Sequence, residues 1–369
     1  MTSPLSPLDP AARYAASRHA AWLGAAALIT DEAGRVLLVR PTYREDGSWL
    51  LPGGAVDPGE HPHDACRREI REELGLDLPL SAVLAVRSFA SGHPDVRPDV
   101  PCPGEIQFVF DGGTLAPAQV AAVRLPRDEL SAYAFLDTQE AGQRLRPADG
   151  RLMLAAYRAR LGHTGTAHLA DGRHVLGVPV LDRLDVHVRH RPLWDRPLRP
   201  GTVPDGLHVR QAWGWCFLPD GRVVLGADPG PRGALPMLPG GTTEHTDPTP
   251  EDTLHREAAE EAQLTLVDPV RLGWVLDETG AVYGGTGPNA RLRLAARVTA
   301  VGPAAADPAT DRTVARLLTT PAQAAALLGW GPAGARQAQL AAALAHDRWG
   351  LPVARPTTVE EIPDEGLRL

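Results

Sequence analysis

The chain has 369 residues, a length at which a single hydrophobic core usually gives way to two domains. Its formal net charge of −8 leaves no excess of cations to replace the counterions of nucleic acid, so general nucleic-acid binding is not expected. All 37 basic residues are arginine, which excludes a Schiff-base lysine and a phosphate-binding loop of the GxxxxGK[ST] kind.

The three cysteines, Cys66, Cys102 and Cys216, are odd in number and lack CxxC spacing. This pattern favours a reducing compartment over a disulfide framework or a zinc site, so we expect a cytoplasmic protein. No apolar run approaches the roughly 18 residues that a membrane helix needs, and no membrane partner is expected.

Apolar periodicity and turn residues predict the elements of the first part of the chain. Strands over 22–30 and 35–40 flank a turn at "DEAG". A helix over 62–74 follows the "LPGG" stretch and is ended by Gly75. Later elements are expected as strands at 81–89 and 105–110 and a helix at 150–161.

The chain then repeats itself. "AGRVLLVR" at 33–40 returns as "DGRVVLGA" at 220–227, 187 positions later, and "LPGG" at 51–54 returns with the same offset. "RREIREE" at 67–73 returns as "HREAAEE" with an offset of 188. A constant offset broken by one inserted residue indicates a tandem duplication. The second copy is expected to hold strands at 212–217, 222–225, 271–276 and 291–301 and helices at 250–262 and 332–345.

These patterns divide the chain into two domains, at 18–175 and 207–352. The Pro/Arg-rich segment 176–206 between them is expected to be a linker. His187 and His190 within it have HxxH spacing, but a solvated linker is favoured over a metal site. The acidic tail 353–369 is expected to be loose.

A group of glutamates lies on one face of the predicted helix over 62–74. At about 100° per residue, Glu69, Glu72 and Glu73 fall within one sector, and Cys66, Ile70 and Leu74 form the neighbouring apolar sector. Like charges on one helix face repel each other. The arginines of this helix are expected on the other side, which would leave the cluster uncompensated; they are Arg67, Arg68 and Arg71.

A carboxylate cluster of this kind is a candidate site for a hard divalent cation such as Mg²⁺, which prefers oxygen ligands. The alternative is a merely charged surface helix. Gly53 and Gly54 just before the helix permit a tight turn that brings backbone carbonyls close to such a cation. Glu60 lies eight residues before Arg68, a spacing suited to an ion pair between loop and helix.

The spacing over residues 54–76 resembles the Nudix box of the Nudix hydrolases at every defined position. These positions are Gly54, Glu60, Arg68, Glu69, Ile70, Glu72, Glu73, Gly75 and Leu76. The resemblance implies an α/β fold of two tandem Nudix-type α/β/α sandwich domains with mixed sheets. It also implies hydrolysis of a diphosphate linkage that joins a nucleoside to another moiety, with Mg²⁺ or Mn²⁺ as the cofactor.

The resemblance further implies roles for the residues of the box. Glu69, Glu72 and Glu73 would hold the metal with help from the carbonyl of Gly53, and Glu69 or Glu72 would orient or deprotonate the attacking water. The structural residues of the box would be Gly54, Glu60, Arg68 and Gly75.

Residues outside the box are candidates for substrate contacts. Arg40 and Arg44 could reach a phosphate or be bystanders, and Glu105 is a candidate for the further glutamate that this family often draws from a later loop. Trp49 and Tyr43 could stack on a base. For Trp49, packing beneath the sheet is the favoured interpretation.

The second copy, whose box covers 241–264, departs from the pattern. Its helix keeps the carboxylates that would hold a metal, which are Glu257, Glu260 and Glu261. The loop before Arg256 is one residue longer, and Asp247 stands roughly where the loop glutamate is expected. Gln263 replaces the glycine that ends the helix, and Ala258 replaces a larger apolar residue. We therefore expect an altered turn and helix end, and doubtful catalysis.

The leading interpretation is a metal-dependent diphosphate hydrolase that uses the first domain. Two alternatives are catalysis by both domains on different substrates, and a nucleotide-sensing or scaffold protein that binds ligand without turnover. The substrate stays open among nucleoside triphosphates, ADP-ribose, nucleotide sugars and other nucleotides. The chain is expected to act either as a monomeric pseudo-dimer or as a homodimer.

Overall fold

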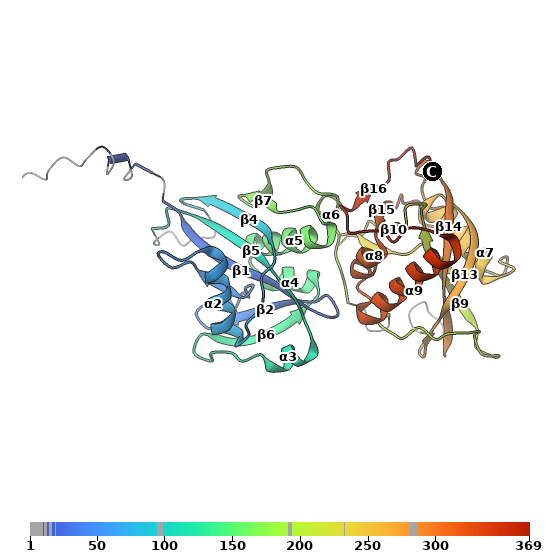
Figure 1. The fold of residues 1–369 in the computed structure, drawn as a ribbon, viewed down its shortest axis with the longest axis horizontal. Coiled ribbons are helices and arrows are strands. Elements are labelled where there is room, and N and C mark those ends of the chain that lie inside the picture. The colour runs from blue at the N-terminus through green and yellow to red at the C-terminus, as the bar shows by residue number, and fades with distance from the viewer. Residues whose placement is uncertain are drawn as a thin grey trace, which may run out of the picture.

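The computed structural model describes residues 10, 13–14, 17–18, 20–93, 99, 101–190, 194–231, 233–280 and 287–369. Within them the chain forms two mixed sheets that lie side by side, each covered by helices (Figure 1). We call residues 20–175 the first half and residues 207–369 the second half. The predicted mixed α/β class is confirmed. Among the described residues, no helix combines the length and the apolarity that crossing a bilayer requires.

The first half is built on a sheet with the order β6-β2-β1-β5-β4-β7-β8, and β3 pairs with β1 beside this path. The β1–β5 and β4–β7 pairs are parallel, and the other pairs are antiparallel. The strands are β1 (Trp22–Asp31), β2 (Val36–Pro41), β3 (Gly53–Ala55), β4 (Val83–Ala90), β5 (Gly104–Leu115), β6 (Leu130–Leu136), β7 (Ala167–Ala170) and β8 (Arg173–His174).

Helices cover both faces of this sheet because successive side chains of a strand alternate between the faces. Ala27 and Ile29 of β1 are buried in the cluster that contains Ile70 of α2, whereas Leu28 is buried in the cluster that contains Leu152 of α5. The helices of the first half are α2 (Pro62–Leu74), α3 (Pro117–Ala122), α4 (Thr138–Arg144) and α5 (Pro147–Gly162), and the short helix α6 (Val180–Arg183) follows them.

The second half carries a sheet with the order β13-β14-β9-β10-β15-β16, in which β9 and β14 are parallel. Its strands are β9 (Val209–Phe217), β10 (Val223–Asp228), β11 (Leu235–Met237), β12 (Gly240–Thr242), β13 (Leu264–Asp277), β14 (Asn289–Val301), β15 (Ala315–Thr319) and β16 (Glu360–Glu361). Its helices are α7 (Pro250–Ala262), α8 (Pro321–Leu328) and α9 (Gly331–Trp349).

The registers of the two sheets reproduce the offset found in the sequence. In the first half Ala26 pairs with Gly53, and in the second half Trp213 pairs with Gly240. Each of these second-half positions lies 187 residues after its counterpart. The strands around the repeated "LPGG" stretch are therefore arranged alike in both halves.

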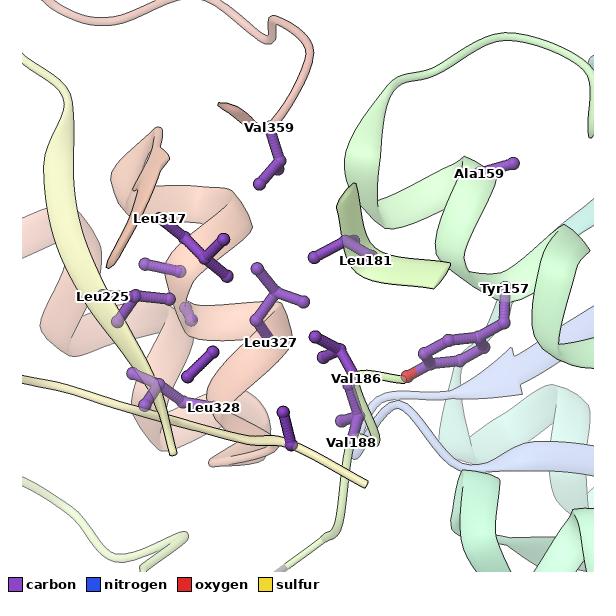
Figure 2. Close-up of a cluster of buried hydrophobic side chains, with 14 of the residues drawn as sticks. Tyr157, Ala159, Leu181, Val186, Val188, Leu225, Leu317, Leu327, Leu328 and Val359 are labelled. Atoms are coloured by element: carbon purple, nitrogen blue, oxygen red, sulfur yellow. The ribbon is translucent and has the colours of Figure 1, made fainter. Parts of the chain in front are cut away.

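The two halves share one apolar core at their junction. The buried residues of this core come from both halves and from the segment between them (Figure 2). Gln323 of α8 donates a hydrogen bond to the carbonyl of Leu161 at 3.2 Å, and the amide of Val359 donates to the carbonyl of Gly162 at 2.9 Å. The halves are thus joined by packing as well as by the chain.

The prediction of a solvated linker is wrong for the middle of segment 176–206. Leu181, Val186 and Val188 are buried in the shared core, and Trp194 is 4% exposed. His187 is also buried, where its ring contacts the hydroxyl of Thr138. Outside the short helix α6 the described backbone of this segment is largely irregular, as its proline-rich composition predicted, but apolar side chains between the prolines are buried in the shared core. Residues 191–193 of this segment lie outside the described residues.

The prediction of a loose tail is also wrong. Glu360 and Glu361 form β16, which extends the second sheet by pairing with β15, and Val359 and Ile362 beside them are 2% exposed. Two apolar side chains that flank an acidic pair are enough to anchor the segment, because the charged side chains of the edge strand can remain in solvent.

Replacing Leu327 with alanine should lower the free energy of unfolding by about 2–5 kcal/mol, because the side chain is 1% exposed in the shared core. Denaturation with urea, followed by tryptophan fluorescence, measures this change. Leu340→Ala is the matched control, since Leu340 lies on α9 and is 53% exposed. Equal midpoints for the two variants would contradict the packing in Figure 2.

Candidate active site

The candidate site is built on α2, whose ends follow from the sequence. Pro62 occupies the first turn, where its missing N–H costs no hydrogen bond. Gly75 ends the helix in the left-handed conformation with φ 69°, and its N–H donates to the carbonyl of Arg71. The predicted helix over 62–74 is confirmed at both ends. Cys66, Ile70 and Leu74 are fully buried, as their sector predicted.

The three carboxylates of α2 differ in their surroundings. The Glu73 side chain is buried and accepts a hydrogen bond from the amide of Gly53 at 2.8 Å. Burial raises the pKa of Glu73 to about 8, and the bond from Gly53 partly opposes the rise. Burial also raises the pKa of Glu69. Glu72, by contrast, has a side chain that is 56% exposed.

Arg68 ties the loop, the sheet and the carboxylates together. Its guanidinium donates to both carboxylate oxygens of Glu60, at 3.2 and 3.0 Å, and to the carbonyl of Ala55 at 3.1 Å. The expected ion pair between loop and helix is therefore present. The same group donates to Glu69 at 2.8 Å and to Glu72 at 3.1 Å.

This geometry corrects the prediction that the arginines of α2 leave the carboxylate cluster uncompensated. Arg68 bends back over the cluster, because the fork of a guanidinium can serve several acceptors at once. Arg67 and Arg71 do lie elsewhere, where both pair with Asp77.

Gly54 is required by the closeness of the strand to the helix. A Cβ atom at this position would lie 2.5 Å from the carboxylate carbon of Glu69, and one at Gly53 would lie 2.3 Å from the carbonyl oxygen of Ala25. The double glycine therefore lets β3 approach both β1 and α2. This approach places the backbone of β3 against the carboxylates.

The donor set fits a hard divalent cation, because carboxylate oxygens are gathered beside a glycine turn. In the described part of the chain, however, no three His, Cys, Asp or Glu side chains form a group ready to hold a metal ion. The carboxylates instead face Arg68 and the amide of Gly53. A cation at this site would have to replace some of these hydrogen bonds.

The structure brings a further glutamate to the cluster that sequence reasoning missed. The charge of Glu129 contributes to the raised pKa of both Glu69 and Glu73. Glu129 directly precedes β6, and its carbonyl accepts a hydrogen bond from the amide of Thr42 after β2. In the sequence, the acidic stretch "RDEL" could have marked Glu129 as a candidate. Only the pairing of β2 with β6 shows that Glu129 lies near the carboxylates of α2.

Glu105 lies in a different part of the site than predicted. It belongs to β5, and the amide of Gln107 donates to it at 2.6 Å. Its pKa is raised by burial and influenced by Arg87 and Asp149. It therefore belongs with the polar groups of the neighbouring cavity, and its proposed role in substrate contacts stays a prediction.

A cavity of about 300 Å³ adjoins the double glycine. Its polar wall is a network in which Arg87 donates to Gln107 and Asp149, and Arg44 contacts Asp149 at 3.5 Å. The apolar remainder comes from β1, β5 and the start of α5. The lining residues include Gly24, Ala26, Tyr43, Gln107, Val109 and Asp149.

Of the aromatic and basic residues predicted to contact substrate, some line this cavity and others do not. Tyr43 lines it and is 71% exposed, so its ring is available to a ligand. Trp49 is buried and carries the guanidinium of Arg144 over its ring at 5.6 Å, which confirms the packing interpretation. Arg44 lines the cavity, whereas Arg40 is exposed outside it.

The second half repeats the interactions of α2 on α7. Arg256 donates to Glu257 at 3.1 Å and to Glu260 at 3.2 Å, and its other nitrogens bind Asp247 at 3.0 Å. Asp247 thus holds the place of Glu60. The guanidinium of Arg256 keeps the pKa of Asp247 well below its usual range.

The last turn of α7 differs from that of α2, although both helices end at matching positions. The N–H of Gln263 donates to the carbonyl of Ala258, five residues back, whereas the N–H of Gly75 donates to that of Arg71, four residues back. Gln263 adopts the left-handed conformation with φ 53° and ends the helix after Ala262, as Gly75 ends α2. Glu261 accepts a long hydrogen bond of 3.4 Å from the amide of Gly240, and burial raises its pKa to about 8. The carboxylate cluster of the second half therefore keeps its shape despite the altered sequence.

Comparison with known proteins identifies the first half. Residues 21–156 match the family model described as NUDIX domain, so this part of the chain is a Nudix domain. A putative 8-oxo-dGTP diphosphatase from Bacillus subtilis is 45% identical over 63 residues, 17% of this chain and 41% of that protein. A nucleoside triphosphatase NudI from Salmonella arizonae is 46% identical over 55 residues, 13% and 39% of the two chains. The chain thus spans about two fifths of these relatives.

Solved structures with a likeness to the chain include the MutT protein from Methanosarcina mazei Go1. That likeness has 24% identity and a TM-score of 0.31, and it covers 38% of this chain and 94% of that one. Another is an ADP-ribose pyrophosphatase from Streptococcus suis 89-1591, with 20% identity and a TM-score of 0.31, covering 41% and 99% of the two chains.

In the presence of a chelator, the stability of the protein should fall as the pH rises from about 5 to 8. Burial raises the folded-state pKa of Glu73 to about 8, whereas the ordinary pKa of a glutamate is 4.5. Between these values the folded state holds a proton that the unfolded state has lost, so a rise in pH favours unfolding. Thermal melts across this pH range measure the slope.

Glu73→Gln should reduce this slope, because the amide does not titrate, and Glu261 should account for part of what remains. Glu140→Gln, at an exposed position of α4, is the control that should leave the slope intact. A slope that Glu73→Gln leaves unchanged would show that Glu73 is ionised in the folded protein throughout this pH range.

Proposed function

We propose that this protein is a metal-dependent hydrolase that cleaves a diphosphate linkage in a nucleoside diphosphate derivative or a nucleoside triphosphate. The observation that carries the proposal is the contact between the carboxylate cluster and the cavity. Glu69 lies against Gly54, and Gly54 also lines the cavity of about 300 Å³. A nucleoside in the cavity would therefore extend its phosphates toward the carboxylates.

A bound Mg²⁺ or Mn²⁺ would supply neutralisation of the phosphate oxygens and a lowered pKa of the attacking water. Glu69, Glu72 and Glu73 are the proposed ligands, together with the carbonyl of Gly53. Glu69 or Glu72 would orient the water or accept its proton. Arg68 would position both carboxylates, since it already contacts each of them.

The walls of the cavity support a nucleoside as the bound group. Tyr43 offers an exposed ring for stacking on a base. Gln107 and Asp149 offer hydrogen-bonding groups for the edge of a base, and Arg44 lies beside them near the path to the carboxylates. The relatives described as a putative 8-oxo-dGTP diphosphatase and a nucleoside triphosphatase favour nucleoside triphosphates within this class.

We further propose that the second half is a second domain of the same family. Its boundaries would be 207–369, because the tail packs onto its sheet, and the first domain would cover 18–175. Glu257, Glu260 and Glu261 are its proposed cation ligands. The shared core supports a monomer that acts as its own pseudo-dimer. The three free, buried cysteines are consistent with the proposed cytoplasmic location.

Glu72→Gln should lower the hydrolysis rate by at least about 100-fold, the usual contribution of a positioned acid or base. Glu72 is exposed on α2, so the melting temperature should change little. The assay is phosphate or nucleotide release from a panel of nucleoside triphosphates and nucleoside diphosphate derivatives with Mg²⁺. Glu260→Gln, the matched change on α7, should leave the rate intact. Full activity of Glu72→Gln would show that the first half is not the catalytic site.

Gly54→Ala should lower kcat by about 100-fold, because a Cβ atom 2.5 Å from the Glu69 carboxylate displaces that side chain. Gly142→Ala is the control, since a Cβ atom there meets nothing within 4 Å. Kinetics of both variants on the best substrate of the panel decide the outcome. Equal kcat values for the two would contradict a catalytic position for Glu69.

A further inference from the structure

The cavity beside Trp213 in the second half is much smaller than the cavity of the first half. The cavity of the first half measures about 300 Å³ and lies between β1, β5 and the start of α5. The corresponding space in the second half lies against β9, β11 and the junction of α8 and α9, and it measures about 30 Å³. The carboxylate cluster is kept in both halves, so the difference lies in the cavity itself.

Larger side chains on two strands account for much of the lost volume. Gly24 and Ala26 of β1 line the first cavity, and the registers against β3 and β12 make Gln211 and Trp213 their counterparts. Both counterparts are buried. A cavity wall of small residues is thus replaced by an amide and an indole.

The strand next to β1 or β9, which is β5 in the first half and β14 in the second, also carries larger side chains in the second half. In the first half Gly24 lies beside Gln107 and Ala26 beside Val109. In the second half the same strand positions place Gln211 beside Arg291 and Trp213 beside Arg293. Arg291 is 2% exposed and Arg293 is fully buried. Two guanidinium groups therefore fill the wall that an amide and a valine form in the first half.

Trp194, from the segment between the halves, fills the remaining space. Its ring lies 5.3 Å from that of Trp213 and 5.6 Å from that of Trp330, with which it stacks. The guanidinium of Arg291 lies over the Trp194 ring at 4.6 Å, and that of Arg293 lies at 5.8 Å. An indole between aromatic rings and cations is held by stacking and cation–π attraction.

Backbone and side-chain bonds hold this segment on both sides of Trp194. The amide of His187 donates to the carbonyl of Ala234 at 3.0 Å, and Arg199 exchanges backbone hydrogen bonds with Trp274 at 2.8 and 3.0 Å. Asp195 accepts a hydrogen bond from the amide of Ala333 in the first turn of α9. The segment is therefore bound to the second half at His187, Asp195 and Arg199, while Val186 and Val188 also hydrogen-bond to Arg158 and Thr138 of the first half.

We infer that the cavity of the second half is a docking site for residues 194–199 of this same chain, with Trp194 in the place that a nucleobase would take. Part of this inference rests on the proposed function, because it assumes that the first cavity takes a nucleoside. The second half then binds its own segment and the chain has a single nucleotide site. The second domain serves as a rigid support that anchors the connection to the first.

The first test is the number of nucleotides bound per chain. Isothermal titration of the full-length protein uses an α,β-methylene nucleoside triphosphate with Mg²⁺. The expected result is one nucleotide per wild-type chain and none for Ala26→Trp, which copies Trp213 into the first half. Gly24→Gln, which copies Gln211, replaces this variant if it does not fold. Two nucleotides per chain, or one still bound to a folded copy variant, would overturn the inference.

The second test does not depend on nucleotide binding. Trp194→Gly should lower the melting temperature by about 5–10 °C, and added indole should restore part of the loss by filling the vacated space. Trp22→Gly is the matched control, because Trp22 is 46% exposed, and indole should not affect it. If Trp194→Gly does not fold, Trp194→Ala takes its place with the same expectation.

The two tests separate the two proposals. A wild-type melting temperature in the folded Trp194 variant, or equal effects of indole on that variant and on wild type, would overturn the docking of Trp194. No nucleotide bound to wild type, together with rescue of the Trp194 variant by indole, would refute the proposed nucleotide site and leave the docking supported.

Discussion

The five hydrogen bonds that Arg68 makes are the interaction on which the candidate site depends. One guanidinium joins the loop at Glu60, the strand at Ala55 and the helix carboxylates Glu69 and Glu72. Without this guanidinium, the negative charges of the carboxylates would repel each other. Burial already disfavours the charged forms of Glu69 and Glu73. Because the group is planar and carries five donors, arginine can make this set of contacts where lysine could not.

The same arrangement recurs around Arg256, which shows how much sequence change this constraint tolerates. Asp247 replaces Glu60 with a shorter side chain from a longer loop, and the carboxylate still reaches the guanidinium at 3.0 Å. Gln263 accepts the left-handed conformation that Gly75 adopts more easily. The helix and its ion pairs are therefore preserved by geometry, although the residues differ.

The faces of the two sheets that lie away from α2 and α7 have diverged much further. In the first half this face leaves a cavity with a polar wall beside the carboxylates. In the second half it holds Trp213, Arg291 and Arg293 and receives Trp194. One side of each sheet thus keeps the carboxylate cluster, and the other side differs in the space that it leaves beside that cluster. The shared core behind these faces holds both halves in one body (Figure 2).

The sequence by itself determined the features that depend on residues close together in the chain. The bounds of α2 and α7, the sector of Glu69, Glu72 and Glu73, and the repeat offset all follow from local patterns, so they could be predicted. Several short elements between the longer ones, including β6, α4, β15 and α8, were missed, because they carry weak periodicity.

Tertiary structure decided what depends on residues far apart in the chain. Glu129 reaches the carboxylates through the pairing of β2 with β6, and the filling of the second cavity depends on strand registers and on Trp194 from the connecting segment. The connecting segment and the acidic tail were expected to be solvated, because their composition is polar and rich in proline. Some of their apolar side chains, including Leu181, Val186 and Val359, are buried because the two halves together provide a core for them.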